Sequence, residues 1–210
     1  MHPNPIYHSA DAARNLGYAR DRGFGVLAIN GPDGPLLAHI PFLAADDGAT
    51  LDLHLVRSNP IARAMTSPQQ ATIAVSGPDS YVSPDFYGVP DQVPTWNYIA
   101  VHLRGRLELL PQDRIRDMLD RQSAHFEALL DPKPRWTTTK MTPDVLDKMM
   151  RQIVPCRMTV TSVDGTWKLN QNKPDAVRLR AADHVKSYGQ GSETALLAAL
   201  MMTPPRKEAP

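Results

Sequence analysis

The sequence predicts a mainly β domain of the α+β class, with its strands in an antiparallel barrel or sandwich. Four short apolar runs lie within about 55 residues, and turns join most of them, which favours antiparallel pairing over alternating βαβ units. A longer alternating run, Asn97–Leu110, has a length that suits a barrel wall. Amphipathic segments follow that run, so we expect helices around the sheet.

Composition bounds the class of protein. The chain has 210 residues, 42% of them apolar and 21% charged, as in an ordinary globular protein. The 23 basic and 22 acidic residues give a net charge of +1, so no general attraction to nucleic acid is expected. One cysteine excludes an internal disulfide framework. The sequence has neither a membrane-spanning apolar stretch nor a signal leader, so we expect a cytoplasmic protein.

We predict a single domain over residues 1–203, a helical insertion near residues 111–154, and a disordered tail from 204 to 210. At the N-terminus, Ser9 is expected to cap a helix that runs to Arg20 and ends at Gly23. Two apolar runs then flank a turn rich in glycine and proline, which predicts a hairpin of Phe24–Ile29 and Leu36–Phe42.

The third strand, near Thr50–Val56, leads into a short helix. Its leucines alternate with other residues at the period of a half-buried strand. Asn59 is a good N-cap and Pro60 a good first helical residue. Arg57 and Ser58 therefore stand beside a helix N-terminus, where a phosphate is well placed to bind. The alternative is a capped surface helix with a solvent-exposed arginine.

The rest of the chain is expected to follow this plan. Ala71–Ser76 forms a fourth strand, Gly77–Thr95 is a long loop, and Asn97–Leu110 is the long strand. Pro111 opens an amphipathic helix with the stripe Ile115, Met118, Leu119, Gln122, Phe126 and Leu129.

A second helix is capped by Thr142 and stopped by Pro155. The strand Cys156–Val163 and a turn at Asp164–Gly165 come next, and two further helices are expected near residues 174–185 and 192–202.

Three histidines, His39, His54 and His102, fall in predicted strands. In one barrel they would be able to converge on zinc or on a haem iron, but their spacing matches no recognised metal signature. Histidines hydrogen-bonded within the wall are the alternative, and we assign no metal site.

Two segments carry groups suited to a planar ligand. Val93–Tyr98 combines an extended entry with Trp96 and Asn97, a stacking surface beside an amide donor. Trp167–Lys173 offers lysine, asparagine and glutamine donors next to a tryptophan. A lid over the core and a solvated turn are the respective alternatives. Cys156 is expected to be buried and inert, and catalytic triads, phosphate loops, dinucleotide fingerprints and helix-turn-helix signals are absent.

These segments together resemble the FMN-binding split-barrel proteins of the PaiB type, often labelled negative transcriptional regulators. The matching pieces keep their order from about Ile6 to Met202. They are His39-Ile40-Pro41, His54 through Pro60, Tyr81-Val82-Ser83-Pro84 with Tyr87, Val93 through Tyr98, and Trp167-Lys168-Leu169 with Gln171-Asn172. At Thr166 and Asn170 the chain departs from the lysine and serine common in the family, so one cationic contact is expected to be missing.

The resemblance implies a six-stranded antiparallel split β-barrel with surrounding helices, and a homodimer with FMN at the interface. It places the phosphate at Arg57, Ser58 and Asn59. The remaining cofactor-binding residues it implies are His39, Pro41, His54, Trp96, Asn97, Trp167, Lys168, Gln171 and Asn172.

The function expected is therefore that of an FMN-binding flavoprotein with a redox or regulatory role. A nicotinamide or another small molecule would be the redox partner of an FMN-dependent oxidoreductase, and no catalytic residue is assigned. The alternative is a transcriptional regulator that uses flavin as a sensor and acts through DNA or a protein, although the low net charge argues against direct DNA binding. A haem-binding split-barrel relative is a weaker alternative, by fold analogy alone.

Overall fold

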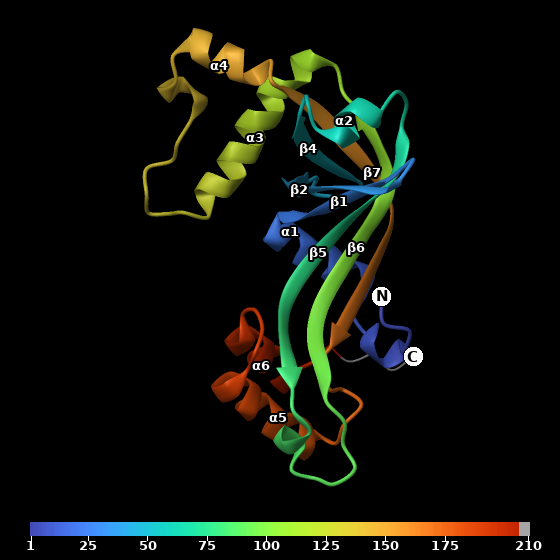
Figure 1. Cartoon of the computed structure of the whole chain (residues 1–210). Coiled ribbons are helices and arrows are strands. Elements are labelled where there is room, and N and C mark those ends of the chain that lie inside the picture. Colours follow the sequence, from blue (N-terminus) through green and yellow to red (C-terminus); the bar gives the residue numbers. More distant parts are fainter. Residues whose placement is uncertain (206–210) are drawn as a thin grey trace. The chain divides into compact units, whose positions relative to one another are not determined.

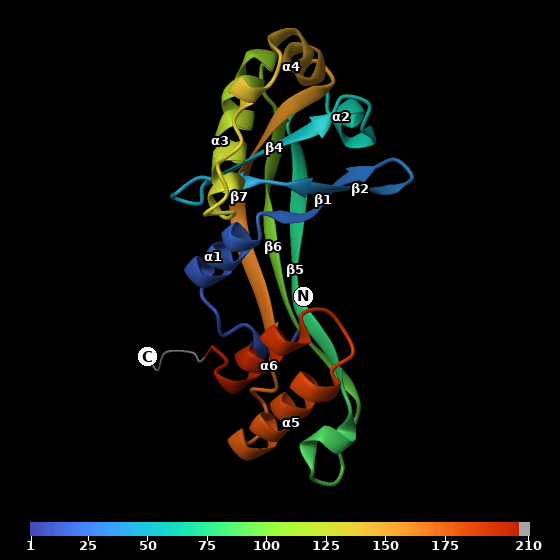
Figure 2. The ribbon, with the colours of Figure 1, turned by 90° about the vertical axis from the view of Figure 1, so that its left-hand side faces the viewer.

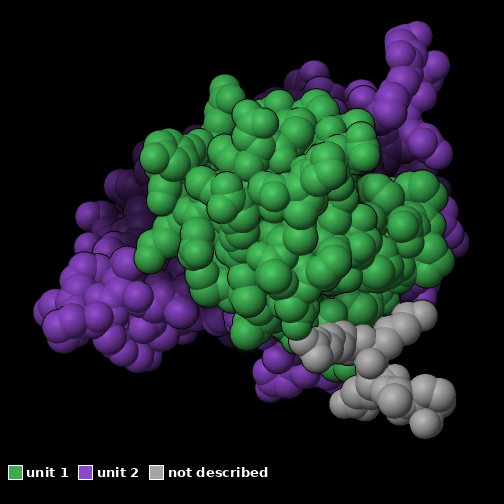
Figure 3. All heavy atoms as spheres, turned by 90° about the horizontal axis from the view of Figure 1, so that it is seen from below, with its two compact units in different colours: residues 1–18, 75–102, 163–210 green, residues 19–74, 103–162 purple. Residues whose placement is uncertain are grey.

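The computed structural model describes residues 1–205, so most of the expected tail lies outside the described residues. The chain divides into two compact units (Figure 3). Unit 1 combines residues 1–18 and 75–102 with the segment that begins at Val163, and unit 2 combines residues 19–74 with 103–162. The single-domain assignment stays a prediction.

Among the described residues, seven strands form one sheet in the order β2-β1-β5-β6-β7-β4-β3. The pairs β1–β2, β1–β5, β3–β4 and β4–β7 are antiparallel, which confirms a mainly antiparallel sheet with surrounding helices. The expected strand number of six is wrong, because β3 has two residues and is too short to show a hydrophobic pattern. The strands are β1 (Phe24–Gly31), β2 (Gly34–Pro41), β3 (Leu43–Ala44), β4 (Thr50–Val56), β5 (Gln69–Val82), β6 (Thr95–Leu109) and β7 (Ile153–Lys168).

In unit 2, β4 has the predicted bounds, and Leu51, Leu53 and Leu55 are buried as their alternation requires. β4 pairs with β7, with Leu53 opposite Cys156. The hairpin of β1 and β2 is also as predicted, and α2 (Pro60–Ala64) packs beside β2 (Figure 2).

The helical insertion of unit 2 begins with the short helix η3 (Gln112–Arg114). It continues through α3 (Ile115–Ala128), η4 (Thr138–Lys140) and α4 (Pro143–Met150), drawn from yellow-green to orange in Figure 1. α3 packs on β4. Thr142 precedes α4 but makes no side-chain capping bond, contrary to expectation.

In unit 1, two C-terminal helices pack against each other, α5 (Asp175–Tyr188) and α6 (Thr194–Met202) (Figures 1 and 2). The short helix η2 (Pro84–Tyr87) contacts α5. The core of this unit joins apolar side chains of both helices to the strands, among them Val82, Ile99, Trp167, Leu169, Val185, Leu197 and Met201.

Two strands run further than the sequence predicts. β5 continues through Gly77 and Pro78, where we expected a loop. The reason is tertiary, because the amides of Asp79 and Tyr81 donate to the carbonyls of Ser192 and Gln190 far along the chain. Such a partner satisfies backbone groups that no local pattern can pair.

β7 likewise begins before Pro155 and passes through Asp164–Gly165, so the predicted helix end and turn are wrong. Its neighbour β6 is also long and runs from Thr95 to Leu109. At the N-terminus, η1 (Pro5–Tyr7) precedes α1 (Ala12–Arg22).

The predicted cap of α1 is also wrong. The Asp11 carboxylate accepts from the Arg14 amide at 2.7 Å in the first turn. The Ser9 hydroxyl donates instead to the carbonyl of Pro205.

Candidate functional site

The turn after β4 has the local structure that the sequence predicts. The side-chain oxygen of Asn59 accepts from the amide of Ile61 at 2.9 Å, and Pro60 opens α2. This helix has five residues, so its dipole is small and one of its free amides is already paired. A phosphate site at this turn therefore depends on side chains more than on the helix.

Arg57 is exposed, yet much of its guanidinium is already bound within unit 2. Nε donates to the Arg151 carbonyl at 3.0 Å and Nη2 to the side-chain oxygen of Gln112 at 2.8 Å. Nη2 also lies 3.4 Å from the carbonyl oxygen of Ile153. Within residues 1–205, Nη1 of Arg57 makes no hydrogen bond, so this nitrogen is the donor available to an anion.

His54 is half-buried on the side of β4 that faces α3. Its Nδ1 lies 3.1 Å from Oε1 of Gln122, whose Nε2 donates to the backbone carbonyl of Asp52 at 2.9 Å. Burial lowers the pKa of His54, and the bond to Gln122 offsets part of that effect. Burial therefore favours the neutral form of His54.

Asp52 carries the main ion-pair network of the same surface. It is 4% exposed, and its carboxylate accepts from Arg157 at 2.7 and 2.9 Å and from Arg121 at 2.7 Å. Burial alone would raise the pKa of Asp52, but the bonds from the two arginines outweigh it and hold the pKa below 3.8. Through Arg121 and Arg157, these ion pairs connect α3 and β7 to β4.

On β2, His39 is exposed and lies opposite Val26 of β1. Its ring stacks on Phe24, with 6.5 Å between centroids. Pro41 is half-buried opposite Phe24. These residues form a small aromatic surface on the β1–β2 hairpin.

In unit 1, Trp96 and Asn97 point to opposite faces of β6. Trp96 is 48% exposed and makes an edge contact with Tyr81. Asn97 is fully buried, and its Nδ2 lies 3.5 Å from Sδ of Met201. Its side-chain oxygen has no hydrogen-bond partner within residues 1–205. Trp96 is thus open to a ligand and Asn97 belongs to the core.

Trp167 is buried against α1. Its Nε1 donates to Oδ1 of Asn15 at 2.8 Å, and its ring makes an edge contact with Tyr18. Lys168 instead donates to the Thr95 hydroxyl at 2.5 Å. Burial lowers the pKa of Lys168.

Gln171 closes a tight turn. Its side chain accepts from the Leu169 amide at 2.7 Å and donates to the Trp167 carbonyl. Asn172, next in the chain, is exposed. The short polar segment is therefore internally bonded around Trp167.

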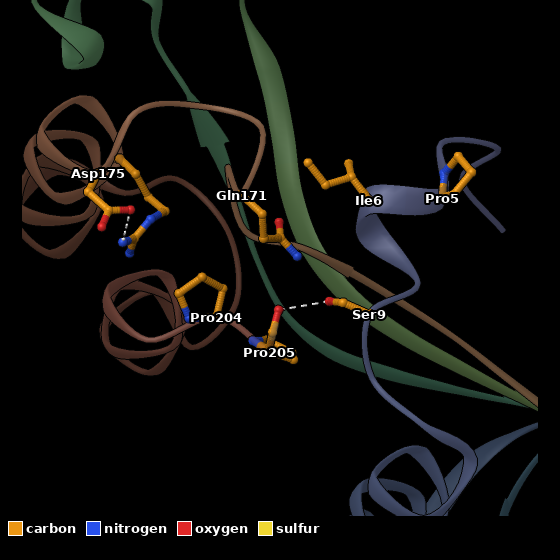
Figure 4. Close-up of a pocket in the computed structure, with 8 residues that line it drawn as sticks. Pro5, Ile6, Ser9, Gln171, Asp175, Pro204 and Pro205 are labelled. Atoms are coloured by element: carbon orange, nitrogen blue, oxygen red, sulfur yellow. Dashed lines mark hydrogen bonds and ion pairs between the residues drawn. The ribbon is translucent and has the colours of Figure 1, made fainter. Parts of the chain in front are cut away.

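Gln171 also lines a pocket of about 490 Å³ in unit 1 (Figure 4). Across it, the Ser9 hydroxyl donates to the Pro205 carbonyl at 2.8 Å. Arg178 is buried here and pairs with Asp175 and with the last carbonyls of α6. No other predicted site residue lines this pocket as far as the structure describes it.

The structure thus gathers the predicted cofactor residues into two sets. His39, Pro41, His54, Arg57, Ser58 and Asn59 lie in unit 2, and Trp96, Asn97, Trp167, Lys168, Gln171 and Asn172 lie in unit 1. Over residues 1–205, no three His, Cys, Asp or Glu side chains group to hold a metal. In the same part of the chain, no helix is long and apolar enough to cross a bilayer.

Sequence reasoning missed the residues that support these sets, chiefly Gln112, Gln122, Asp52 and Asn15. A polar Gln122 within the apolar stripe of α3 was a signal, because a buried amide needs partners. Asp52 beside the leucines of β4 was another. Nothing local marks Gln112 or Asn15, whose partners lie far along the chain.

Residues 1–162 match the family model described as "Putative FMN-binding domain". The matched part includes Arg57 and Trp96 and ends before Trp167. Among curated proteins, the chain is 25% identical over 186 residues to "Protease synthase and sporulation protein PAI 2" of Bacillus subtilis, which covers 87% of this chain and 88% of that protein.

Solved structures share the fold. The FAD and heme binding protein of Mycobacterium smegmatis has a TM-score of 0.57 at 16% identity, covering 87% of this chain and 80% of its own. The flavocytochrome Anf3 of Azotobacter vinelandii has a TM-score of 0.53 at 16% identity, covering 73% and 65%. At these identities the likeness shows a shared fold and carries no residue roles.

Proposed function

Because the chain belongs to the FMN-binding domain family whose model matches residues 1–162, we propose that it is a flavoprotein that holds the FMN phosphate at Arg57 and Ser58. The family assignment confirms the expected cofactor, FMN. The observation that carries the phosphate assignment is the group of exposed donors after β4 in the matched part of the chain.

The donors at this turn suit a phosphate. Nη1 of Arg57 and the exposed side chain of Ser58 make no hydrogen bond in the part of the chain that the structure describes. No acidic residue lies between Arg57 and Met65, and Arg63 adds a second positive charge. A phosphate would therefore meet charge-assisted hydrogen bonds, and the turn itself carries no carboxylate to repel it.

Within each unit taken by itself, we propose its exposed or half-buried groups as candidates for contacts with the flavin ring. Trp96 offers an open aromatic face and Lys168 a positive charge, and His39 with Phe24 offers a stacked pair. His54, Pro41 and Asn59 support the phosphate side. Asn97 and Trp167 are buried and Gln171 is bonded within its own turn, so we propose that they support the segments around the ring. Asn172 is the exposed member of this group.

Bound FMN supplies hydride or electron transfer, for which a nicotinamide or another small molecule is the partner we propose. The chain's contribution is binding and orientation, and no residue is assigned to move a proton. We also propose that the protein is a homodimer with FMN at its interface. Its test is the molecular mass in solution with and without FMN.

The test of the proposed function is an absorbance spectrum. The purified protein is incubated with FMN and desalted, and we expect a yellow protein with one FMN per chain. Riboflavin, which lacks the phosphate, is expected to be retained poorly. A protein that stays colourless after incubation with FMN overturns the proposal.

The regulatory alternative has one supporting observation, the similarity to PAI 2, whose name concerns protease synthesis and sporulation in its own organism. Sequence-dependent gel-shift binding that weakens steeply with salt would support it. The net charge of +1 argues against direct DNA binding.

A further inference from the structure

Gln112 connects the two ends of the helical insertion to Arg57. Its Oε1 accepts from Nη2 of Arg57 at 2.8 Å. Its Nε2 donates to the carbonyls of Met150 at 3.0 Å and Ile153 at 3.2 Å. Because an amide nitrogen only donates, these two bonds fix the orientation of the amide, and its oxygen must face Arg57.

The carbonyls of Met150 and Arg151 lie at the end of α4, and that of Ile153 lies at the start of β7. The last carbonyls of a helix have no partner within the helix and need one outside it. Gln112 supplies that partner to Met150, and Nε of Arg57 supplies it to Arg151 at 3.0 Å. A positive side chain also suits the negative end of a helix dipole. Arg57 is thus hydrogen-bonded to the C-terminal end of α4 before any ligand binds.

These hydrogen bonds leave Nη1 of the guanidinium available to bind an anion. With Nε and Nη2 held, the side chain has lost most of its rotamer freedom, so binding through Nη1 costs little further entropy. Without Gln112, Nη2 would keep only the 3.4 Å contact with Ile153, and the guanidinium would turn more freely.

We propose that Gln112 is a positioning residue for the phosphomonoester of FMN, which acts by holding Arg57 on the end of α4. The inference rests on the proposed function, since it takes Arg57 as the phosphate ligand. The two effects are reciprocal. If the bonds between Arg57 and the end of α4 favour phosphate binding, then bound phosphate stabilises those bonds by the same free energy.

The experiment is a double-mutant cycle with two ligands. FMN and riboflavin affinities are measured by fluorescence titration for the wild type, Gln112→Met, Arg57→Ala and the double variant. Gln70→Met, an exposed glutamine with no bond to Arg57, is the matched control. Methionine keeps the length of glutamine and removes its hydrogen bonds.

We expect Gln112→Met to weaken FMN binding about fivefold, because the substitution removes one hydrogen bond that holds Arg57 in place. Riboflavin affinity is expected to stay unchanged. In the Arg57→Ala background the Gln112 substitution is expected to add nothing, because the residue it positions is gone. Hydrogen exchange of α4 should slow on FMN binding in the wild type and less in Gln112→Met.

The outcomes separate the two proposals. Wild-type FMN affinity in Arg57→Ala overturns the phosphate assignment of the proposed function. If Arg57→Ala weakens FMN but Gln112→Met does not, or the two effects add, the positioning role is overturned and the phosphate site stands. Equal losses of FMN and riboflavin affinity in Gln112→Met would show a general structural effect and also overturn it.

Discussion

The side-chain oxygen of Gln122 lies 3.1 Å from Nδ1 of His54, while the nitrogen of the same amide lies 2.9 Å from the carbonyl oxygen of Asp52. Because a carbonyl oxygen only accepts, the Gln122 nitrogen must face Asp52 and its oxygen must face His54. Nδ1 of His54 therefore carries the proton, and Nε2 carries a lone pair.

We therefore predict a neutral His54 with its proton on Nδ1. Its pKa should lie below 6.5, because burial disfavours the charged ring. A pH titration by nitrogen-detected NMR measures both properties. Gln122→Glu should raise this pKa, because a carboxylate would then face Nδ1. A proton on Nε2, or a pKa above 6.5 in the wild type, contradicts the assignment.

The same shift predicts how stability depends on pH. Below 6.5 the unfolded chain takes up a proton at His54 before the folded chain does, so the free energy of unfolding falls as pH decreases through this range. His54→Gln should flatten that slope. His125→Gln, on α3 outside this network, is the control. Denaturant unfolding at several pH values measures the slope, and an unchanged slope in His54→Gln would refute the prediction.

Asp52→Asn should destabilise the fold by about 3 kcal/mol, because it breaks a buried carboxylate's bonds to Arg121 and Arg157. The pKa of Asp52 is lowered, so its contribution is present above pH 3.8 and is lost as pH falls through the folded-state pKa.

The matched control for this prediction is Asp117→Asn. Asp117 pairs with the same Arg121 at the surface, with its side chain 62% exposed, and should cost about 0.5 kcal/mol or less. Urea unfolding compares the two variants, and equal losses would contradict the role of burial.

Two glycine substitutions should act in opposite directions. A Cβ on Gly105 of β6 would overlap the backbone carbonyl of Thr159, which cannot move aside, so Gly105→Ala should cost about 1–3 kcal/mol. Gly17 of α1 has nothing within 4 Å of an added Cβ. Gly17→Ala should therefore stabilise the fold by about 0.5–1 kcal/mol. Thermal unfolding of both variants checks the signs.

Arg57→Ala should weaken FMN binding by about 2–3 kcal/mol, the value typical of a charge-assisted contact. Raised salt should narrow the difference from the wild type, because ions screen an exposed arginine. Arg63→Ala, an exposed arginine of α2, should change the affinity much less. Equal effects of the two substitutions would mean that general positive charge, and not Arg57, holds the phosphate.

The sequence by itself determined the local elements and the family. The leucine alternation of β4, the Asn59 cap and the β1–β2 hairpin follow from patterns within a few residues, and all three are present. The ordered short motifs also indicated an FMN-binding domain, which the family match confirms.

Only the tertiary structure decided what supports these elements. The extension of β5 depends on the carbonyl acceptors of residues 190 and 192. The bonds of Arg57 to Gln112 and Arg151 join positions 55 and 94 residues apart. Such bonds leave no periodic trace in the sequence, because each involves single residues whose neighbours in the chain do not share the contact. The orientation of His54 depended in the same way on one amide of α3.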